Sequence, residues 1–335
     1  MVTIKDVARL ANVSTATVSR TIAEPGKVSE STREKVQKAI DESGYVTNTL
    51  ARNFRRRRTS VVVVLVPDIS NTFFSSIIRG IEGVALKHGY HILLGDTQNN
   101  PERERAYSEM VSQRQADGII CLGMNIPFTY HKGRKTVDPQ WPPFVMACEY
   151  DGVIPVPTVC IDNVRAAEDA VNHLIELGHR DIAFINGPKD SPLCRDRLKG
   201  YRQAMKSAGL SVPSGWIRNG DFSLRSGHQR MSAILEEVEK PSAVFCANDE
   251  MAIGAMQAAR ETGLKLPKEL SVIGFDDIEI AEYAHPTLST VHQPREQMGE
   301  QAMRLMLDIL DKRAHIGSRI VLSHELIPRD SSVST

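Results

Sequence analysis

The sequence has no long hydrophobic run, and aromatic residues make up only 5% of it. No apolar stretch approaches the ~20 residues that a helix needs to cross a lipid bilayer. The chain begins with a charged, patterned segment and not with a basic tip followed by an apolar stretch, so we predict no secretory signal. These absences predict a cytoplasmic protein with no membrane partner.

Cysteine is scarce and falls in no CxxC pair. The five cysteines are Cys121, Cys148, Cys160, Cys194 and Cys246. Most of them lie in apolar, strand-like runs, which is typical of buried, reduced thiols and not of zinc ligands or redox groups. We therefore expect no metal and no cofactor.

The common catalytic and cofactor-binding motifs are also missing. The sequence has no GxGxxG, no GxxxxGKS or GxxxxGKT, no GxSxG and no HExxH. A nicotinamide-dependent dehydrogenase would need glycines after the apolar run at 61–67, where PDISNTFF stands instead. We predict that the protein is not an enzyme.

What the sequence does contain is ordinary globular material with an uneven distribution of charge. Its 335 residues are 41% hydrophobic, enough for a sizeable core, and the length predicts about two domains. Residues 1–60 hold 12 Lys and Arg against 6 Asp and Glu, a net charge of +6, and the remaining residues carry −6. A basic segment joined to an acidic body suggests a head that binds nucleic acid.

The first sixty residues carry a pattern of three helices. Thr3 can cap the first helix, Ser14 the second, and Ser29 or Ser31 a third helix that Gly44 ends. Two short helices joined by a tight turn and braced by a third form a helix-turn-helix unit. The spacing alone leaves open a plain three-helix bundle with an exposed polar face.

The second helix has the residues that a groove-reading helix needs. Thr15, Ala16 and Thr17 are small, and small residues let a helix enter the major groove closely. Arg20 could reach a guanine edge or a phosphate.

The stretch TIKDVARLANVSTATVSR resembles the DNA-binding head of the LacI/GalR family of bacterial repressors, with near-continuous similarity over residues 2–58. The resemblance implies a second helix that reads the major groove, and a hinge helix that forms on the operator and wedges an apolar side chain into the minor groove. It implies these DNA-contacting residues: Thr3, Ser14, Thr15, Ala16, Thr17, Arg20, Ser31, Asn48, Phe54 and Arg55.

The segment NTLARNFRRRR is the hinge candidate. Asn48 is a good N-cap, and a helix of about two turns is marginal alone in water, so we expect it to form only when docked. The resemblance puts Phe54 where a leucine usually wedges between base pairs, and phenylalanine is an acceptable wedge. Arg55 and the three arginines that follow predict phosphate contacts in preference to a solvated linker.

The body alternates apolar runs with helical patterns, which predicts doubly wound α/β layers. The pattern occurs twice, so we expect two lobes with a ligand cleft beyond the carboxyl ends of their strands. GHRDIAFINGP, AVFCANDEMAIGAM and LSVIGFDDIE are similar to blocks of the same family. The resemblance implies a periplasmic-binding-protein-like core of two doubly wound lobes, a homodimer, and an effector in the cleft.

The predicted boundaries are not contiguous. We expect a helix-turn-helix head at 1–46 and a hinge helix and linker at 47–60. The N-terminal core lobe is expected at 61–160 with 289–318, and the C-terminal core lobe at 161–288 with 319–330, including a strand pair near 319–328.

The resemblance and the strand ends together point to an effector site. Arg197 and Asp276 align with the family's cleft arginine and aspartate, which could grip vicinal hydroxyls by charge-assisted bonds. Asn248 could bond a hydroxyl, while Asp249 could merely cap a helix. The full predicted set is Phe73, Phe74, Glu149, Ser191, Leu193, Arg197, Phe222, Asn248 and Asp276.

The identity of the effector is predicted from three phenylalanines and one resemblance. Phe73, Phe74 and Phe222 could stack a flat heterocycle. GPKDSPLCRDRLKGY resembles the branch of the family that responds to cytidine and other nucleosides. The resemblance also implies that a free purine base is disfavoured, because Ser191 and Leu193 stand where the purine-responsive branch has an arginine and a threonine. We predict a nucleoside, acting as an inducer. Ribose or another sugar is the alternative, and a solute-binding receptor without DNA function is an alternative of a different class.

Overall fold

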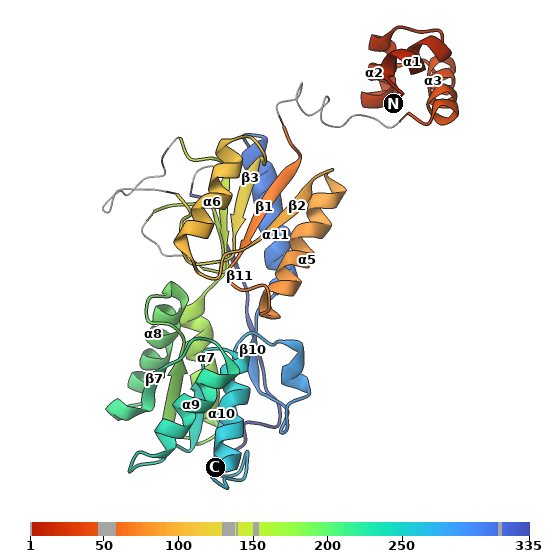
Figure 1. Ribbon diagram of the computed structural model, residues 1–335. Helices are drawn as coiled ribbons and strands as arrows, with labels where there is room; N and C mark the ends of the chain where they lie inside the picture. The colour runs from red at the N-terminus through yellow and green to blue at the C-terminus, as the bar shows by residue number, and fades with distance from the viewer. Residues whose placement is uncertain (1, 46–57, 129–137, 139, 150–153, 314–316) are drawn as a thin grey trace. The chain divides into compact units, whose positions relative to one another are not determined.

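The structure is a computed structural model that describes residues 2–45, 58–128, 138, 140–149, 154–313 and 317–335 (Figure 1). The chain forms two compact units, Met1–Thr59 and Ser60–Thr335. The predicted hinge residues Asn48, Phe54 and Arg55 lie outside the described residues. Within the described part of the chain, no helix is both long and apolar enough to cross a membrane.

The smaller unit holds the three predicted helices, which are confirmed. They are α1 (Ile4–Leu10), α2 (Thr15–Ala23) and α3 (Glu30–Ser43), with a 3-10 turn, η1 (Pro25–Lys27), between the last two. Buried apolar residues of the three helices pack into one core: Val7, Ala8, Ala11, Val18, Val36 and Ala39.

Local signals set the ends of these helices. Asn12 takes a left-handed φ of 53° between α1 and α2, a conformation that asparagine tolerates. Ser14 Oγ accepts a hydrogen bond from the Thr17 N–H at 3.0 Å and so caps α2. Helix α3 begins directly after Ser29, so the cap position is Ser29 and not Ser31, and Gly44 ends the helix with φ 63°.

The larger unit contains a six-stranded sheet in the order β11-β5-β4-β3-β1-β2. All of its neighbouring strands are parallel. Its strands are β1 (Val61–Val66), β2 (His91–Asp96), β3 (Gly118–Cys121), β4 (Phe144–Ala147), β5 (Thr158–Ile161) and β11 (Arg319–Leu322). Helices α5 (Phe73–Lys87), α6 (Pro101–Ser112) and α11 (Arg295–Leu310) cover it.

Helices on both faces of the sheet explain why β1 is apolar at every position. Val62, Val64 and Val66 pack in the cluster that contains residues of α5 and α11. Val63 and Leu65 pack in a separate cluster with Val111 of α6. Because successive side chains of a strand point to opposite faces, a strand buried on both faces needs apolar residues throughout.

A second, four-stranded parallel sheet has the order β7-β6-β8-β9. Its strands are β6 (Ile182–Asn186), β7 (Ile217–Asn219), β8 (Ala243–Cys246) and β9 (Ser271–Ile273). Its helices are α7 (Asn163–Glu176), α8 (Pro192–Ser207), α9 (Leu224–Leu235) and α10 (Asp249–Glu261), with 3-10 turns η2 (Ser214–Trp216) and η3 (Glu279–Glu282). Strand order reverses next to β1 in one sheet and next to β6 in the other, and such points favour ligand sites at the strands' carboxyl ends.

The last strands correct one predicted boundary. β11 pairs in parallel with β5 and therefore belongs to the first lobe, not to the C-terminal lobe to which 319–330 was assigned. β12 (Glu325–Ile327) pairs instead with β10 (Thr290–His292), so 319–328 is not a strand pair. The sequence pattern shows two short apolar segments here, but their partners lie far away along the chain.

Candidate functional site

The predicted effector residues all follow strands of the two sheets at the carboxyl ends. Phe73 and Phe74 follow β1, Glu149 follows β4, Ser191, Leu193 and Arg197 follow β6, Phe222 follows β7, Asn248 follows β8, and Asp276 follows β9. Parallel strands present their carboxyl ends on one edge, so each sheet gathers its own members of the set.

Arg197 is a buried cation held on several sides. Its Nε donates to Asn163 Oδ1 at 2.9 Å, and its Nη1 donates to the Ala247 carbonyl. Its guanidinium carbon lies 3.6 Å from the centre of the Phe275 ring, a cation–π geometry. Burial lowers the pKa of Arg197, and the nearby Asp276 carboxylate opposes that shift.

Asp276 is the carboxylate that faces this cation. Its Oδ1 lies 3.8 Å from Arg197 Nη2 and accepts a hydrogen bond from Gln293 Nε2 at 2.7 Å. Burial raises its pKa to about 6, although Arg197 acts in the other direction. Because 3.8 Å exceeds hydrogen-bond length, the two charged groups attract each other, but Arg197 does not donate a hydrogen bond to Asp276.

Glu149 and Ser191 connect the two lobes. Ser191 Oγ, at the start of α8, donates to Glu149 Oε2, after β4, at 3.3 Å. Burial raises the pKa of Glu149 to about 7, while Ser191 and Arg197 oppose the rise. This hydrogen bond therefore links a carboxyl group at the end of a first-lobe strand to the start of a helix in the C-terminal lobe.

The three phenylalanines are split between the lobes. Phe73 and Phe74 meet edge to face with ring centres 5.1 Å apart. Phe222 adopts a φ of 72° and packs so closely on Gly187 that a Cβ there would lie 2.5 Å from its ring. In the described residues no ring contact joins Phe222 to the other two, so the structure brings two of the three together.

Asn248 has a structural role that the sequence left open. Its Oδ1 accepts the Met251 N–H at 3.0 Å and caps α10, so Asn248, and not Asp249, is the cap. Its Nδ2 donates to the Phe222 carbonyl at 2.9 Å and so holds the loop that carries that ring. Leu193, in the first turn of α8, is partly buried and adds only apolar surface.

Asp249 is buried behind the site. Its carboxylate accepts hydrogen bonds from Thr290 Oγ1 at 2.5 Å and from the Ile278 N–H at 2.9 Å. Burial raises its pKa well above the ordinary value. Through Thr290, Asp249 links the start of α10 to β10, the strand that leads into α11 of the first lobe.

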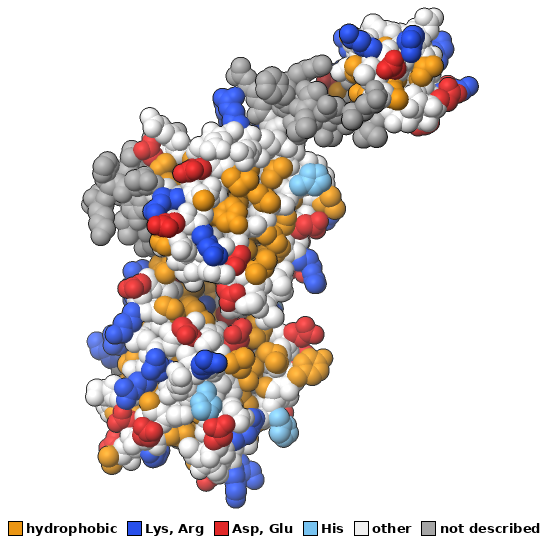
Figure 2. All heavy atoms as spheres, viewed as in Figure 1, with side chains coloured by type: hydrophobic (Ala, Val, Ile, Leu, Met, Phe, Trp, Pro, Cys, Tyr) orange, Lys and Arg blue, Asp and Glu red, His pale blue; other side chains and the backbone are white. Residues whose placement is uncertain are grey.

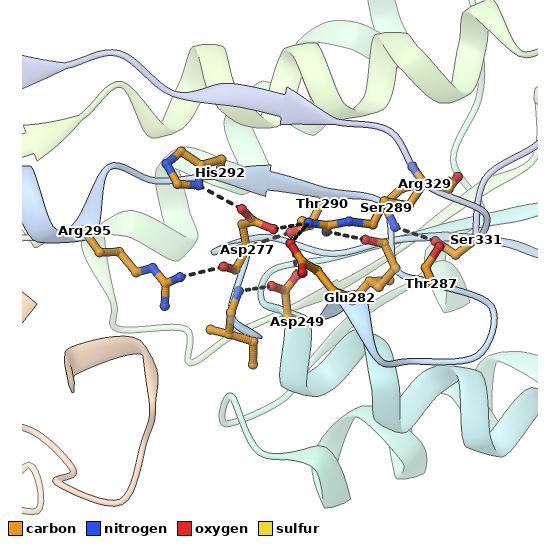
Figure 3. A network of polar contacts seen from close by, with 12 residues as sticks. Asp249, Asp277, Glu282, Thr287, Ser289, Thr290, His292, Arg295, Arg329 and Ser331 are labelled. Atoms are coloured by element: carbon orange, nitrogen blue, oxygen red, sulfur yellow. Dashed lines mark hydrogen bonds and ion pairs between the residues drawn. The ribbon is translucent and has the colours of Figure 1, made fainter. Parts of the chain in front are cut away.

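A polar network beside the site, centred on Asp277, escaped the sequence analysis (Figure 3). Asp277 accepts from His292 Nδ1 at 2.9 Å and Arg329 Nη2 at 2.8 Å, and its carbonyl accepts from Arg295 Nη2 at 2.6 Å. Although burial opposes it, the hydrogen bonds from Arg329 and His292 lower the pKa of Asp277. The two adjacent aspartates after β9, Asp276 and Asp277, are the signal that could have found it, but the sequence predicts only Asp276 as an effector residue.

In the head, exposed residues of α2 border a hollow. Thr15, Ala16 and Arg20 are exposed, and they line it with Ser19 and with residues 4–5 of α1. Thr17 contacts Ser14 through its hydroxyl at 2.9 Å, and the Thr3 N–H donates to Asp6 at 3.0 Å. Ser31 is exposed on α3 and is not one of the residues that line the hollow.

No cluster of three or more His, Cys, Asp or Glu side chains suited to a metal ion occurs among the residues that the structure describes. The described cysteines are all buried and free of disulfides.

Comparisons with known proteins bear on both units. Residues 3–48 match the family model for bacterial regulatory proteins of the lacI family, and residues 171–332 match that for a periplasmic binding protein-like domain. The chain is 44% identical over 333 residues to the HTH-type transcriptional repressor CytR of Escherichia coli strain K12, covering 98% of this chain and 96% of CytR. It is 37% identical over 332 residues to the repressor PurR of Klebsiella pneumoniae strain 342, covering 99% and 97%.

Solved structures give the same result for the fold. The lac repressor dimer bound to operator and the anti-inducer ONPF superposes with a TM-score of 0.86 and 26% identity, covering 99% of each chain. A complex of the transcriptional regulator CelR with cellobiose superposes with a TM-score of 0.73 and 32% identity, covering 99% of this chain and 100% of that one.

Proposed function

The chain belongs to the LacI family of DNA-binding bacterial transcriptional regulators, and from that we propose that it is a repressor whose operator affinity is set by a nucleoside. The proposal has a DNA-reading step in the head, an effector-binding step in the core, and a dimer that couples them. It places the protein in the cytoplasm, where its operator would lie.

For the DNA step, we propose that α2 enters the major groove. Thr15 and Ala16 are small and exposed at its start, and Arg20 is exposed one turn later. Small side chains permit close approach, and an arginine can make two hydrogen bonds to guanine or one contact to phosphate. The hinge residues Asn48, Phe54 and Arg55 belong to this proposal as minor-groove contacts.

One observation carries the effector step: Arg197 and Asp276 lie buried together, 3.8 Å apart, without a hydrogen bond between them. Both retain the capacity to bond a further group: one ribose hydroxyl could accept a hydrogen bond from the arginine, and the adjacent hydroxyl could donate one to the carboxylate. Phe73, Phe74 and Phe222 supply apolar rings for the base. Glu149 and Ser191 supply polar groups from both lobes.

A sugar is the second candidate effector. Arg197 and Asp276 would grip the hydroxyls of ribose as readily as those of a nucleoside. The similarity to a CelR structure that contains cellobiose favours this alternative. A solute-binding receptor without DNA function is disfavoured, because residues 3–48 match a regulatory head.

We propose that the protein is a homodimer that associates through apolar surface on both lobes. Figure 2 shows hydrophobic side chains gathered on the upper lobe where β2 and α5 lie. The exposed large apolar residues of the core unit include Ile69, Leu86, Leu93, Leu94, Leu224, Ile280 and Tyr283. Contiguous exposed apolar surface on a soluble domain usually marks an interaction site.

In the proposed mechanism the effector draws the two lobes together. It would contact Glu149 from one lobe and Arg197 and Asp276 from the other. The Asp276–Gln293 and Asp277–Arg295 hydrogen bonds would pass the change to α11 of the first lobe. We propose an inducer, and a coupling free energy of ~1–3 kcal/mol would lower operator affinity about 5- to 150-fold.

Calorimetric titration of the full-length protein with cytidine, cytosine and ribose tests the effector step. Much tighter binding of cytidine than of either fragment would support a site for both base and ribose. Equal binding of ribose and cytidine would favour the sugar alternative. If none of the three binds, the nucleoside proposal is wrong, while selection of an operator from random DNA still tests the DNA step.

A further inference from the structure

Helix α8 carries a row of basic side chains on its outer face. Arg195, Lys199, Arg202 and Lys206 are all exposed. They follow one another at intervals of four, three and four residues, so they fall within about 60° of each other around the helix and span ~16 Å along it. We call these four residues the α8 basic row.

The row stands out against its surroundings. Figure 2 shows Lys and Arg side chains gathered over α8, although residues 61–335 carry more Asp and Glu than Lys and Arg. Arg195 lies 3.9 Å from Asp196. Over the described ranges, Lys199, Arg202 and Lys206 have no ion pair with a carboxylate within 4.0 Å.

The row is unfavourable for the helix that carries it. Like charges three or four residues apart on a helix repel, and three such pairs occur here. Lys206 lies in the last turn, where the helix dipole favours a cation, but Arg195 lies near the first turn, where it does not. Local stability therefore does not explain the row.

The surface between these cations is hollowed and partly apolar. A shallow hollow is lined by Arg195, Leu198, Lys199, Arg202, Gln203 and Lys206. Leu198 is partly buried and packs against the core cluster. The hollow thus combines an apolar floor with a line of positive charge.

We propose that the α8 basic row is a docking surface for an acidic helix of a partner protein. Carboxylates spaced three and four residues apart on such a helix would lie opposite the four cations, and one apolar side chain would cover Leu198. The sugar-phosphate backbone of DNA offers phosphates to the cations but no projecting apolar side chain that would cover Leu198. A protein helix therefore matches the surface better than nucleic acid does.

The same helix begins directly after Ser191 and carries the buried Arg197, and both residues belong to the proposed effector site. A partner bound to the outer face would thus contact the helix that positions two residues proposed to bind the effector. The docking surface itself does not depend on the identity of that effector.

The test uses the full-length protein and a labelled helical peptide. The peptide has Glu at four positions with the spacing of the row and one Leu beside them, and a matched peptide has Gln in place of each Glu. We expect the Glu peptide to bind at least tenfold tighter than the Gln peptide, with affinity falling as salt is added. Lys199→Glu with Arg202→Glu should weaken Glu-peptide binding at least tenfold.

The control is Lys265→Glu with Lys268→Glu, which makes the same change of charge at exposed lysines elsewhere on the lobe. It should leave peptide binding within about twofold. Equal binding of both peptides, or equal losses in the two double variants, would overturn the proposal. If the Glu variant unfolds, Lys199→Gln with Arg202→Gln should still weaken Glu-peptide binding, and the salt dependence of the unmodified protein stands independently.

A DNA-binding measurement distinguishes an acidic protein partner from nucleic acid. If the row contacts DNA, replacing Lys199 and Arg202 should lower the slope of log affinity against log salt by roughly 0.9 per lost phosphate contact. We expect that slope, measured on operator DNA or random duplex, to stay unchanged. A reduced slope would assign the row to nucleic acid and overturn the protein-partner proposal.

Discussion

At the scale of single residues, the core unit keeps several charged groups out of water beside one another. Arg197 is compensated by Asp276, Asn163 and a backbone carbonyl, whereas Glu149 has one hydrogen-bond partner among the described residues, the Ser191 hydroxyl. Buried charges lower stability unless they are paired or serve another purpose. Their concentration at the strand ends, where ligands bind in such folds, is consistent with the proposed effector site.

Asp276→Asn is the sharpest substitution for the effector step. Asparagine has nearly the same shape and can still accept the Gln293 hydrogen bond, but it cannot form a charge-assisted bond to a ligand hydroxyl. Such bonds contribute roughly 1.5–3 kcal/mol, so cytidine affinity should fall about 10- to 150-fold while operator binding without effector is retained. Calorimetry and DNA-binding titrations measure the two quantities.

Asp181→Asn is the matched control, since Asp181 is exposed directly before β6, at the opposite end of that strand. It should leave both affinities unchanged. An Asp276→Asn protein that folds and binds cytidine normally would remove Asp276 from the site.

Glu149 should make stability depend on pH. Its pKa in the folded protein is about 7, above the ordinary 4.5, so between these values the folded state binds more protons than the unfolded state. Its contribution therefore lowers the stability progressively as pH rises from about 4.5 through about 7. Glu149→Gln should raise the Tm relative to the unmodified protein, and the difference should grow over that pH window in thermal unfolding measurements.

The same unfolding series on Glu168→Gln, an acidic residue of α7, provides the comparison. A constant Tm difference between Glu149→Gln and the unmodified protein at every pH would contradict the raised pKa.

At the scale of elements, α5 and α11 pack backbone to backbone in the first lobe. A Cβ on Gly80 would lie 2.1 Å from the Glu296 carbonyl oxygen, and one on Gly299 would lie 2.0 Å from the Ile77 carbonyl oxygen. Neither backbone atom can move away without separating the helices. Because α11 also carries Arg295, which bonds Asp277, this contact links the effector region to the first lobe.

Gly80→Ala should therefore destabilise the protein. Forcing a methyl group into the crossing requires the helices to shift, with an expected loss of ~1–3 kcal/mol in the free energy of unfolding. Gly83→Ala, in the same helix, meets nothing within 4 Å and should be neutral or stabilising by up to ~1 kcal/mol. Denaturant unfolding of both variants measures the contrast, and equal effects would show that the crossing is not tight.

At the scale of the whole molecule, the proposed regulator depends on two copies of the chain. A dimer presents two heads to a two-fold symmetric operator, and the binding of one head raises the effective concentration of the other. Apolar surface on both lobes would hold the dimer together, so monomers should bind operator weakly even when each head is intact.

Leu86→Asp should produce monomers and weaken operator binding at least tenfold. Leu86 is 60% exposed at the end of α5, and a carboxylate there would be buried without a partner in the proposed dimer. Val238→Asp is the control, because Val238 is 99% exposed in the segment between α9 and β8. Analytical ultracentrifugation and operator titration test both, and a dimeric Leu86→Asp protein would exclude this face.

Phe54→Ala tests the proposed minor-groove wedge. A side chain inserted between base pairs adds binding free energy only where the DNA is kinked around it. Specific operator affinity should therefore fall far more than affinity for random duplex. Titrations against both DNAs measure the ratio. Equal losses on the two would leave Phe54 without a wedge role.

Much of this protein could be read from neighbouring residues. The cap at Ser14, the stop at Gly44 and the unbroken apolar run of β1 rest on signals only a few positions apart. Family blocks also located Arg197 and Asp276, whose side chains the structure brings together. Those features were predictable because helix ends and strand faces are set by local hydrogen bonds and side-chain periodicity.

Other features were decided only by tertiary structure. Whether Asn248 or Asp249 caps α10 depended on residues from other segments. The Phe222 carbonyl holds the Asn248 side chain, while Thr290 and Ile278 donate hydrogen bonds to the Asp249 carboxylate. Arg329 donates a hydrogen bond to Asp277, although the two residues are 52 positions apart in the sequence. β11 follows the C-terminal lobe in the sequence but pairs with β5 of the first lobe. The sequence by itself determined the elements, the basic head and the family. The partners of β11, Asn248 and Asp277 were left to the packed structure, because parallel pairing and buried hydrogen bonds join groups that no local pattern relates.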